Sequence, residues 1–308
     1  MEYQDSSLSN LTSWSDLGTY VVEPTTTHCH TIILLHGLSS NGKKFGSELL
    51  ETGVNLSGRK LSQLLPNARF IFPTAKPRRS SAFKRIVLTQ WFDVARIPDP
   101  EYRKETQIQG LMESAVELEQ LIRQEASIVS PQNVVIGGLS QGCAMSLSAL
   151  LVLDFPLGGF IGMSGWLPFR KEIEEAIQDD DDDDDDAEID DDNPFATSKS
   201  VNEFELQARD PPLKALIFER DLLSLPPLAN ATKANTAQDT PIFLGHGDSD
   251  EKKPYQQGEA AARTMQAAGY EVVWKLYHEL GHWYKIPDEI DDIITFAKSK
   301  VGWVMSEG

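Results

Sequence analysis

Short apolar, β-branched runs alternate along this chain with longer amphipathic segments, and this alternation limits the fold more than any other feature. Such alternation is typical of a parallel sheet with helices packed on its faces. The strand-like runs are Tyr20–Val22, Thr31–Leu35, Arg69–Phe72, Asn133–Ile136, Gly159–Met163, Pro241–Leu244 and Glu271–Tyr277. Helical periodicity marks Phe45–Glu51, Glu105–Ala126, Gln141–Leu153, Pro254–Ala267 and Asp288–Lys300. Several strands are apolar nearly throughout, so we predict an α/β fold: a mostly parallel central sheet with helices on both faces.

The 308 residues are expected to form one domain over 20–308, preceded by an N-terminal tail over 1–19. The alternation stops between residues 171 and 239, which we interpret as an insertion within the domain. Eleven Asp and one Glu lie within 179–192, with no basic residue among them. Like charges at this density repel one another and cannot bury enough apolar surface to offset the entropy of ordering, so we predict a disordered loop over 179–200.

A second helical pattern follows the acidic run, over 212–225. Leu213, Leu216, Ile217, Leu222 and Leu223 give this segment an apolar face that must pack against something. The favoured interpretation places it on the flank of the domain. The alternative is a lid over an active site.

The composition excludes several classes of protein. The net charge of −19 argues against nucleic-acid binding, because an acidic surface repels phosphate. The N-terminus lacks a signal peptide and no apolar run reaches the ~20 residues that span a bilayer, so we expect a cytoplasmic protein. The only cysteines, Cys29 and Cys143, are too few for a disulfide framework. His28–Cys29–His30 supplies too few ligands to close a metal site, and no dinucleotide motif is present, so we predict neither metal nor cofactor.

The strongest motif is the sequence Gly-Leu-Ser-Gln-Gly at 138–142, which follows a predicted strand and opens a predicted helix. This is the setting of a nucleophile elbow, in which the serine hydroxyl projects above the sheet from a tight turn. Ser140 is therefore the predicted nucleophile. The alternative is a serine that only caps the helix, which has a similar local geometry.

A serine nucleophile needs a base and a carboxylate that orients the base, in the chain order Ser, Asp or Glu, His for this kind of elbow. His282 is the first choice as base and His278 the second, because both follow the last predicted strand. Asp248 and Asp250 both follow the strand before it, and spacing alone does not separate them. The oxyanion donors are expected to be the backbone N–H groups of Gln141 and of Leu38, in the loop after His36–Gly37.

Six segments together resemble the phospholipase/carboxylesterase family of α/β-hydrolases, which includes acyl-protein thioesterases and lysophospholipases. They are ILLHGLSSNG at 33–42, QWFDV at 90–94, VVIGGLSQGCAMSLSALL at 134–151, SGWLPF at 164–169, HGDSD at 246–250 and the stretch Tyr277 to His282. The resemblance implies the α/β-hydrolase fold, Asp250 as the acid, His282 as the base, and Leu38 and Gln141 as the oxyanion donors. Two segments depart from the family pattern: the long insertion, and Glu251–Lys252–Lys253–Pro254 after HGDSD, where an apolar segment is usual.

The resemblance also implies an acyl ester or thioester substrate, such as a palmitoyl protein or other lipidated protein, or a lysophospholipid. The acyl-binding loop of the family precedes the Trp-Phe-Asp sequence, which points to Ile86, Val87, Leu88 and Trp91 as substrate-binding residues. The same loop holds the most basic patch of the chain, which consists of Lys76, Arg78, Arg79, Lys84 and Arg85. We interpret it either as a solvated loop or as a transient contact with an anionic membrane surface. Two rival functions stay open: a general carboxylesterase for small esters, and a hydrolase fold kept as a binding scaffold. The sequence predicts no oligomeric state.

Overall fold

A computed structural model describes residues 18–178, 210–228 and 232–306. The disordered loop predicted for 179–200 lies outside these residues, as does most of the predicted tail. Seven strands form one sheet in the order β1-β3-β2-β6-β7-β8-β9, in which all neighbours are parallel except β1 and β3. Their bounds are β1 Tyr20–Val22, β2 His30–Leu35, β3 Ala68–Phe72, β6 Val134–Leu139, β7 Gly159–Met163, β8 Ile242–Gly247 and β9 Val272–Tyr277.

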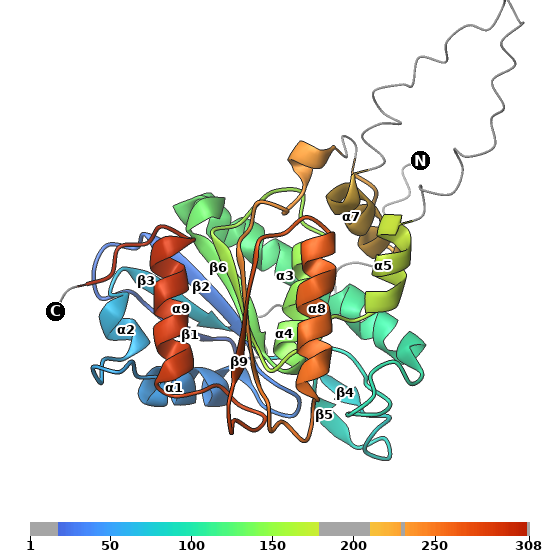
Figure 1. Cartoon of the computed structure of the whole chain (residues 1–308), viewed down its shortest axis with the longest axis horizontal. Helices are drawn as coiled ribbons and strands as arrows, with labels where there is room; N and C mark the ends of the chain where they lie inside the picture. Colours follow the sequence, from blue (N-terminus) through green and yellow to red (C-terminus); the bar gives the residue numbers. More distant parts are fainter. Residues whose placement is uncertain (1–17, 179–209, 229–231, 307–308) are drawn as a thin grey trace, which may run out of the picture.

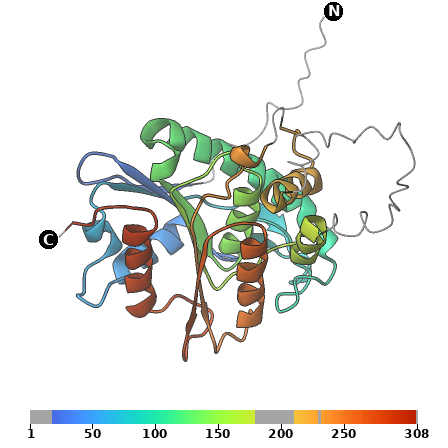
Figure 2. The ribbon, with the colours of Figure 1, turned by 45° about the horizontal axis from the view of Figure 1, so that its top comes forward.

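Helices cover both faces of this sheet (Figure 1). On one face lie α1 (Gly42–Thr52), α2 (Leu61–Leu64) and α9 (Asp288–Ser299), and on the other α3 (Ile108–Val129), α4 (Gln141–Leu151) and α8 (Tyr255–Ala267). Figure 2 shows α8 and α9 on either side of β9. This arrangement confirms the predicted α/β fold with a mostly parallel sheet, and it follows from strands that are apolar on both sides. In β2, Ile33 belongs to the core on the α4 side and Ile32 to the core on the α1 side.

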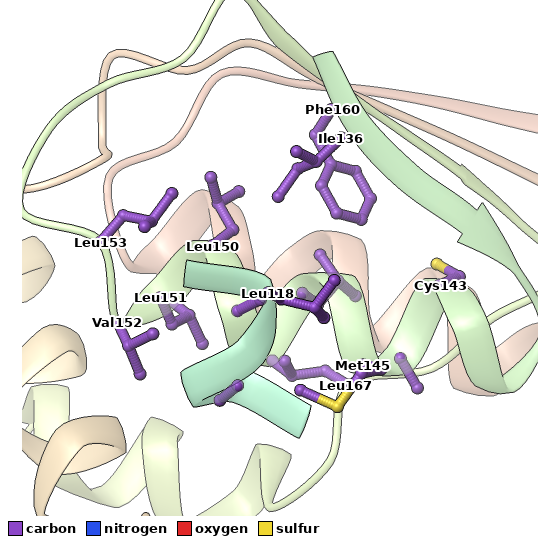
Figure 3. Close-up of a cluster of buried hydrophobic side chains, with 14 of the residues drawn as sticks. Leu118, Ile136, Cys143, Met145, Leu150, Leu151, Val152, Leu153, Phe160 and Leu167 are labelled. Atoms are coloured by element: carbon purple, nitrogen blue, oxygen red, sulfur yellow. The ribbon is translucent and has the colours of Figure 1, made fainter. Parts of the chain in front are cut away.

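The helix that follows the elbow, α4, is buried in the hydrophobic core. Every residue of α4 is buried, which explains why its sequence is apolar on all sides rather than amphipathic. Figure 3 shows its side chains packed beside Leu118 of α3 and beneath Ile136 and Phe160 of the sheet. Cys143 is also buried here, and burial raises the pKa of its thiol, which makes it an inert packing residue. The helix that begins after Ser140 is thereby fixed against the sheet.

The predicted helix at 212–225 is present as α7 (Pro211–Leu222), and it packs on α5 (Arg170–Gln178) and α4. Arg220 donates to the carbonyl oxygen of Val152 at 2.7 Å, just past the end of α4 opposite Ser140. The helix therefore lies on the flank, and the lid interpretation is wrong. One feature was not predicted: an antiparallel hairpin of β4 (Pro77–Arg79) and β5 (Val87–Thr89). Within the described residues, no helix is long and apolar enough to cross a membrane.

Candidate active site

The candidate nucleophile lies where β6 meets α4. Ser140 has φ 58° and ψ −118°, a backbone conformation that a residue with a side chain rarely adopts. Its N–H donates to the carbonyl oxygen of Met163 at 2.8 Å, which ties the turn to β7. A Cβ atom at Gly138 or Gly142 would lie 2.5 Å or 2.1 Å from the carbonyl oxygen of Leu35, so this close approach requires both glycines of the motif. The predicted elbow geometry is present.

A continuous hydrogen-bond chain leaves Ser140. Its Oγ lies 2.7 Å from Nε2 of His282, and Nδ1 of the same ring lies 2.7 Å from Oδ2 of Asp250. A carboxylate only accepts, so Nδ1 carries the proton and Nε2 is free to accept the serine proton. All three residues follow the carboxyl ends of strands β6, β8 and β9, and the loops after β8 and β9 meet at the lower edge of the molecule in Figure 1.

The structure separates the alternatives that spacing left open. His278 pairs instead with Asp248, at 2.7 Å between Nδ1 and Oδ2, and its side chain is 84% exposed. This hydrogen bond lowers the pKa of Asp248 and raises that of His278. The side chain of His282 is only 15% exposed and that of Asp250 is buried. The two candidate bases therefore pair with different aspartates, and only the His282–Asp250 pair contacts the serine.

The Asp250 carboxylate has more partners than the sequence indicated. Its Oδ1 accepts the backbone N–H groups of Lys252 and Lys253, both at 2.9 Å, and its Oδ2 also lies 3.1 Å from Nε2 of His246. Burial by itself would raise the pKa of Asp250, but the hydrogen bonds from His246, His282 and the Lys253 N–H hold it well below its usual range. The carboxylate is thus fixed in its ionised form. The spacing of four residues between His246 and Asp250 was a signal for this contact, which the sequence reasoning missed.

The predicted oxyanion donors lie on either side of Ser140. Gln141 is the first residue of α4, where a helix leaves its N–H groups without intrahelical acceptors. Its side chain bonds to the backbone of Trp91 and Phe92, at 3.1 Å and 2.7 Å. Leu38 lines the same pocket as Ser140. The loop that holds Leu38 is tied to β5, because the N–H of the next residue, Ser39, donates to the carbonyl oxygen of Thr89 at 2.9 Å.

A buried histidine braces this loop from below. Nδ1 of His36 lies 2.7 Å from the carbonyl oxygen of Gly37, and its Nε2 accepts the N–H of Ala75 at 3.0 Å. Burial lowers the pKa of His36 to about 4, so the ring stays neutral and keeps this tautomer. Trp91 adds a bond of 2.8 Å from its indole nitrogen to the carbonyl oxygen of His36. Trp91 is fully buried, and this bond ties it to the start of the loop.

A pocket of about 560 Å³ opens over Ser140 and His282. Its apolar lining is Leu38, Phe45, Phe83, Ile97, Leu139 and Trp283, and Lys44, Glu48 and Lys252 supply polar groups. None of Ile86, Val87, Leu88 and Trp91 is among the lining residues, because the first three lie on the hairpin strand or its approach and Trp91 lies beneath the loop. Phe83, at the hairpin tip, and Phe45, on α1, also line this pocket and were missed by the sequence reasoning. No group of three or more metal-ligating side chains is found among the described residues.

The basic patch is only partly free. Lys76 and Arg78 form ion pairs with Glu117 and Glu113 of α3, the second at 2.7 Å. Arg79, Lys84 and Arg85 remain on the exposed part of the hairpin. Beside them are Phe83, Ile86 and Val87, which are 44%, 59% and 53% exposed. The hairpin tip therefore combines cationic and apolar side chains.

The fold and the elbow–histidine–carboxylate arrangement define the α/β-hydrolase class. Residues 18–180 match the family model described as Phospholipase/Carboxylesterase, which is more than half of the chain. The chain belongs to this family of serine hydrolases. Residues 216–303, which carry Asp250 and His282, also match the model of the prolyl oligopeptidase family.

Similar proteins agree with this assignment. Acyl-protein thioesterase 1 of Gibberella zeae is 26% identical over 89% of this chain and 92% of its own length. Carboxylesterase SOBER1 of Arabidopsis thaliana is 26% identical over 82% of both chains. The crystal structure of Zea mays acyl-protein thioesterase 2 superposes with a TM-score of 0.60 at 24% identity, covering 92% of this chain and 99% of that one, and supports the fold.

Proposed function

We propose that this protein hydrolyses acyl esters or thioesters through Ser140, His282 and Asp250. The observation that carries the proposal is the unbroken hydrogen-bond chain from the serine hydroxyl through both ring nitrogens to the carboxylate. Two features support the proposal. The three side chains are arranged as a nucleophile, a base and an orienting acid, and the elbow holds the serine in a strained conformation. No other described serine has both features.

In the proposed reaction, His282 takes the proton of Ser140 as the oxygen attacks the acyl carbonyl carbon. The imidazolium is stabilised by Asp250, which remains ionised. The N–H groups of Leu38 and Gln141 donate to the oxyanion of the tetrahedral intermediate. His282 then protonates the leaving alcohol or thiol, the acyl-enzyme forms, and water repeats the sequence to release the acid.

The proposed substrate is an acylated or lipidated protein, with a lysophospholipid as an alternative of the same chemistry. Two of the similar proteins are named acyl-protein thioesterases, and the apolar lining of the pocket suits an acyl chain. The rival is a general carboxylesterase for small esters, which the names of other relatives favour. A leaving thiol needs less help from a proton than an alcohol does, so one site can serve both reactions.

We further propose that the hairpin tip contacts anionic membrane surfaces, with Arg79, Lys84 and Arg85 near the headgroups and Phe83 and Ile86 at the interface. The support is the combination of exposed cationic and apolar side chains on one hairpin. Phe83 also lines the pocket, so a substrate held at that surface would lie close to Ser140.

The test compares wild-type protein with Ser140→Ala and His282→Ala. We expect labelling by a fluorophosphonate probe to be lost in Ser140→Ala and kcat to fall by about 10⁴ or more in both variants, because triad members act as a unit. Circular dichroism should show both variants folded. Wild-type turnover in Ser140→Ala would contradict the proposal, and absence of any probe labelling in the wild-type protein would favour the scaffold alternative.

The substrate class is tested separately. Wild-type kcat/KM is compared for p-nitrophenyl esters of short and long chain length and for an S-palmitoylated peptide. The proposal expects preference for the long chain and the thioester. Preference for the shortest ester, with no turnover of the peptide, would favour the general carboxylesterase.

A further inference from the structure

The residue whose backbone N–H donates to the candidate catalytic carboxylate also carries a buried lysine side chain. Lys253 is only 2% exposed, and its Nζ lies 3.8 Å from the centroid of the Trp166 ring. Nζ has no hydrogen-bond partner within the described part of the chain. Removing an ammonium group from water is unfavourable unless it is paired, so a lysine in this place needs a reason beyond packing.

The backbone of the same residue is fixed to the carboxylate on both sides. The Lys253 N–H donates to Oδ1 of Asp250 at 2.9 Å, and the Lys253 carbonyl oxygen lies 2.9 Å from Nε2 of His246. Because both the carbonyl and the carboxylate only accept, His246 must donate from Nε2 to both. Lys253, His246 and Asp250 thus form one closed set of hydrogen bonds, to which His282 is attached through Oδ2.

The charges around Nζ come from separate elements. Asp250, in the loop after β8, and Asp99, in the segment between β5 and α3, attract the ammonium, and the Trp166 ring contributes a cation–π contact. Burial opposes them and dominates, so that the pKa of Lys253 falls to about 7. His246 of β8 faces the backbone of Lys253. The amine therefore changes charge in the range where a serine hydrolase works.

We propose that Lys253 is a positioning residue for Asp250, and that the Lys253 ammonium supplies a buried countercharge to this carboxylate and disfavours the imidazolium form of His282. The inference rests on the proposed triad and deepens it. A buried positive charge that attracts Asp250 favours the ionised carboxylate and disfavours a second positive charge on the histidine. The histidine then stays in the form that accepts the serine proton down to a lower pH than it otherwise would.

The experiment replaces Lys253 by Met, which keeps an unbranched apolar stem and removes the charge at every pH. The acid limb of the kcat/KM profile is measured between pH 5 and 9 with a short p-nitrophenyl ester, together with the rate of fluorophosphonate labelling, which needs no substrate binding. We expect both acid limbs to move to higher pH by about 0.5–1 unit, the size of an effect from one nearby charge. Near pH 9, where the wild-type amine is already neutral, kcat/KM should agree within about threefold.

The matched control is Lys298→Met, which removes an exposed ammonium of α9 and should leave both profiles unchanged. Lys253→Gln repeats the test with a polar neutral side chain if Lys253→Met does not fold. An unchanged acid limb, with activity lowered equally at all pH values, would show a structural role only and overturn this inference while leaving the proposed triad intact. A wild-type protein without Ser140-dependent turnover would overturn both.

Discussion

At the scale of single residues, the turn after β8 directs Asp250 toward His282 and Asp248 toward His278. Ser140 could be predicted because the residues around an elbow are dictated by close backbone contacts, such as that of Gly142 with Leu35. Choosing between Asp248 and Asp250 needed the resemblance to a family, since both residues follow the same strand and only their side-chain directions differ. Those directions depend on the turn after β8, in which the Asp250 N–H lies 3.4 Å from the carbonyl oxygen of Gly247. The contact with His246 depends on the same turn and was missed for that reason.

The two aspartates give a direct test at this scale. We expect Asp250→Asn to lower kcat by about 10³–10⁴, because the amide no longer stabilises the correct tautomer and the charged form of His282. Asp248→Asn weakens contacts with His278 and with the Glu279 N–H, neither of which touches Ser140 or His282, and should change kcat by less than about threefold. Steady-state kinetics on a p-nitrophenyl ester measures both. A larger loss in Asp248→Asn would mean that the acid is misassigned.

At the scale of elements, the predicted strands and helices were confirmed wherever burial determines the pattern. All seven expected strands are present, and the strand before the elbow continues three residues further, to Leu139. The β4–β5 hairpin was missed because its strands have only three residues each, too few to show a periodicity. In addition, β4 consists of a proline and two arginines, which β propensity does not mark. The hairpin is held by a tertiary contact, in which the Ser39 N–H donates to the carbonyl oxygen of Thr89.

The hairpin carries the prediction at this scale. Reversing Arg79, Lys84 and Arg85 to Glu should weaken binding to vesicles of phosphatidylserine and phosphatidylcholine by roughly 100-fold at low salt, because each basic residue near the surface contributes about 1 kcal/mol. Turnover of a short soluble ester should be unchanged, since the bonds to the oxyanion loop are made by Thr89. Vesicle sedimentation measures the binding.

The control for this experiment reverses three exposed cations elsewhere, Lys171, Arg263 and Lys298, so that the net charge is matched. Equal weakening by both sets would mean that only the total charge matters. Equal loss of turnover on soluble and vesicle-bound esters in the hairpin variant would mean that the hairpin shapes the pocket rather than a docking surface.

At the scale of the whole molecule, two buried carboxyl groups link stability to pH. Glu219 of α7 and Glu289 of α9 are both buried, and burial raises the pKa of each to about 8. Neither could be recognised from the sequence, where both look like ordinary helix-surface charges. Both groups fold in the protonated form. Their contribution to stability is therefore complete below the unfolded pKa, near 4.5, and is lost as the pH rises to about 8.

Each of the two carboxyls therefore lowers the free energy of unfolding by about 1.4 kcal/mol per pH unit between pH 5 and 8. Below about pH 6.5 His36 offsets part of this decrease, because its folded pKa of about 4 lies below its unfolded value. Lys253 acts in the opposite sense at higher pH: its folded pKa lies below its unfolded one, so its unfavourable contribution is complete below pH 7 and fades between pH 7 and 10.5. Urea denaturation at a series of pH values measures the decrease. Glu219→Gln should reduce the slope of the free energy of unfolding against pH between pH 5 and 8, because the neutral amide has no proton to lose. The substitution should leave the active site intact, because α7 lies at the end of α4 away from Ser140. A slope identical to that of the wild-type protein would mean that Glu219 reaches water in the folded state. As a control, the turnover of a short ester should be the same in both proteins.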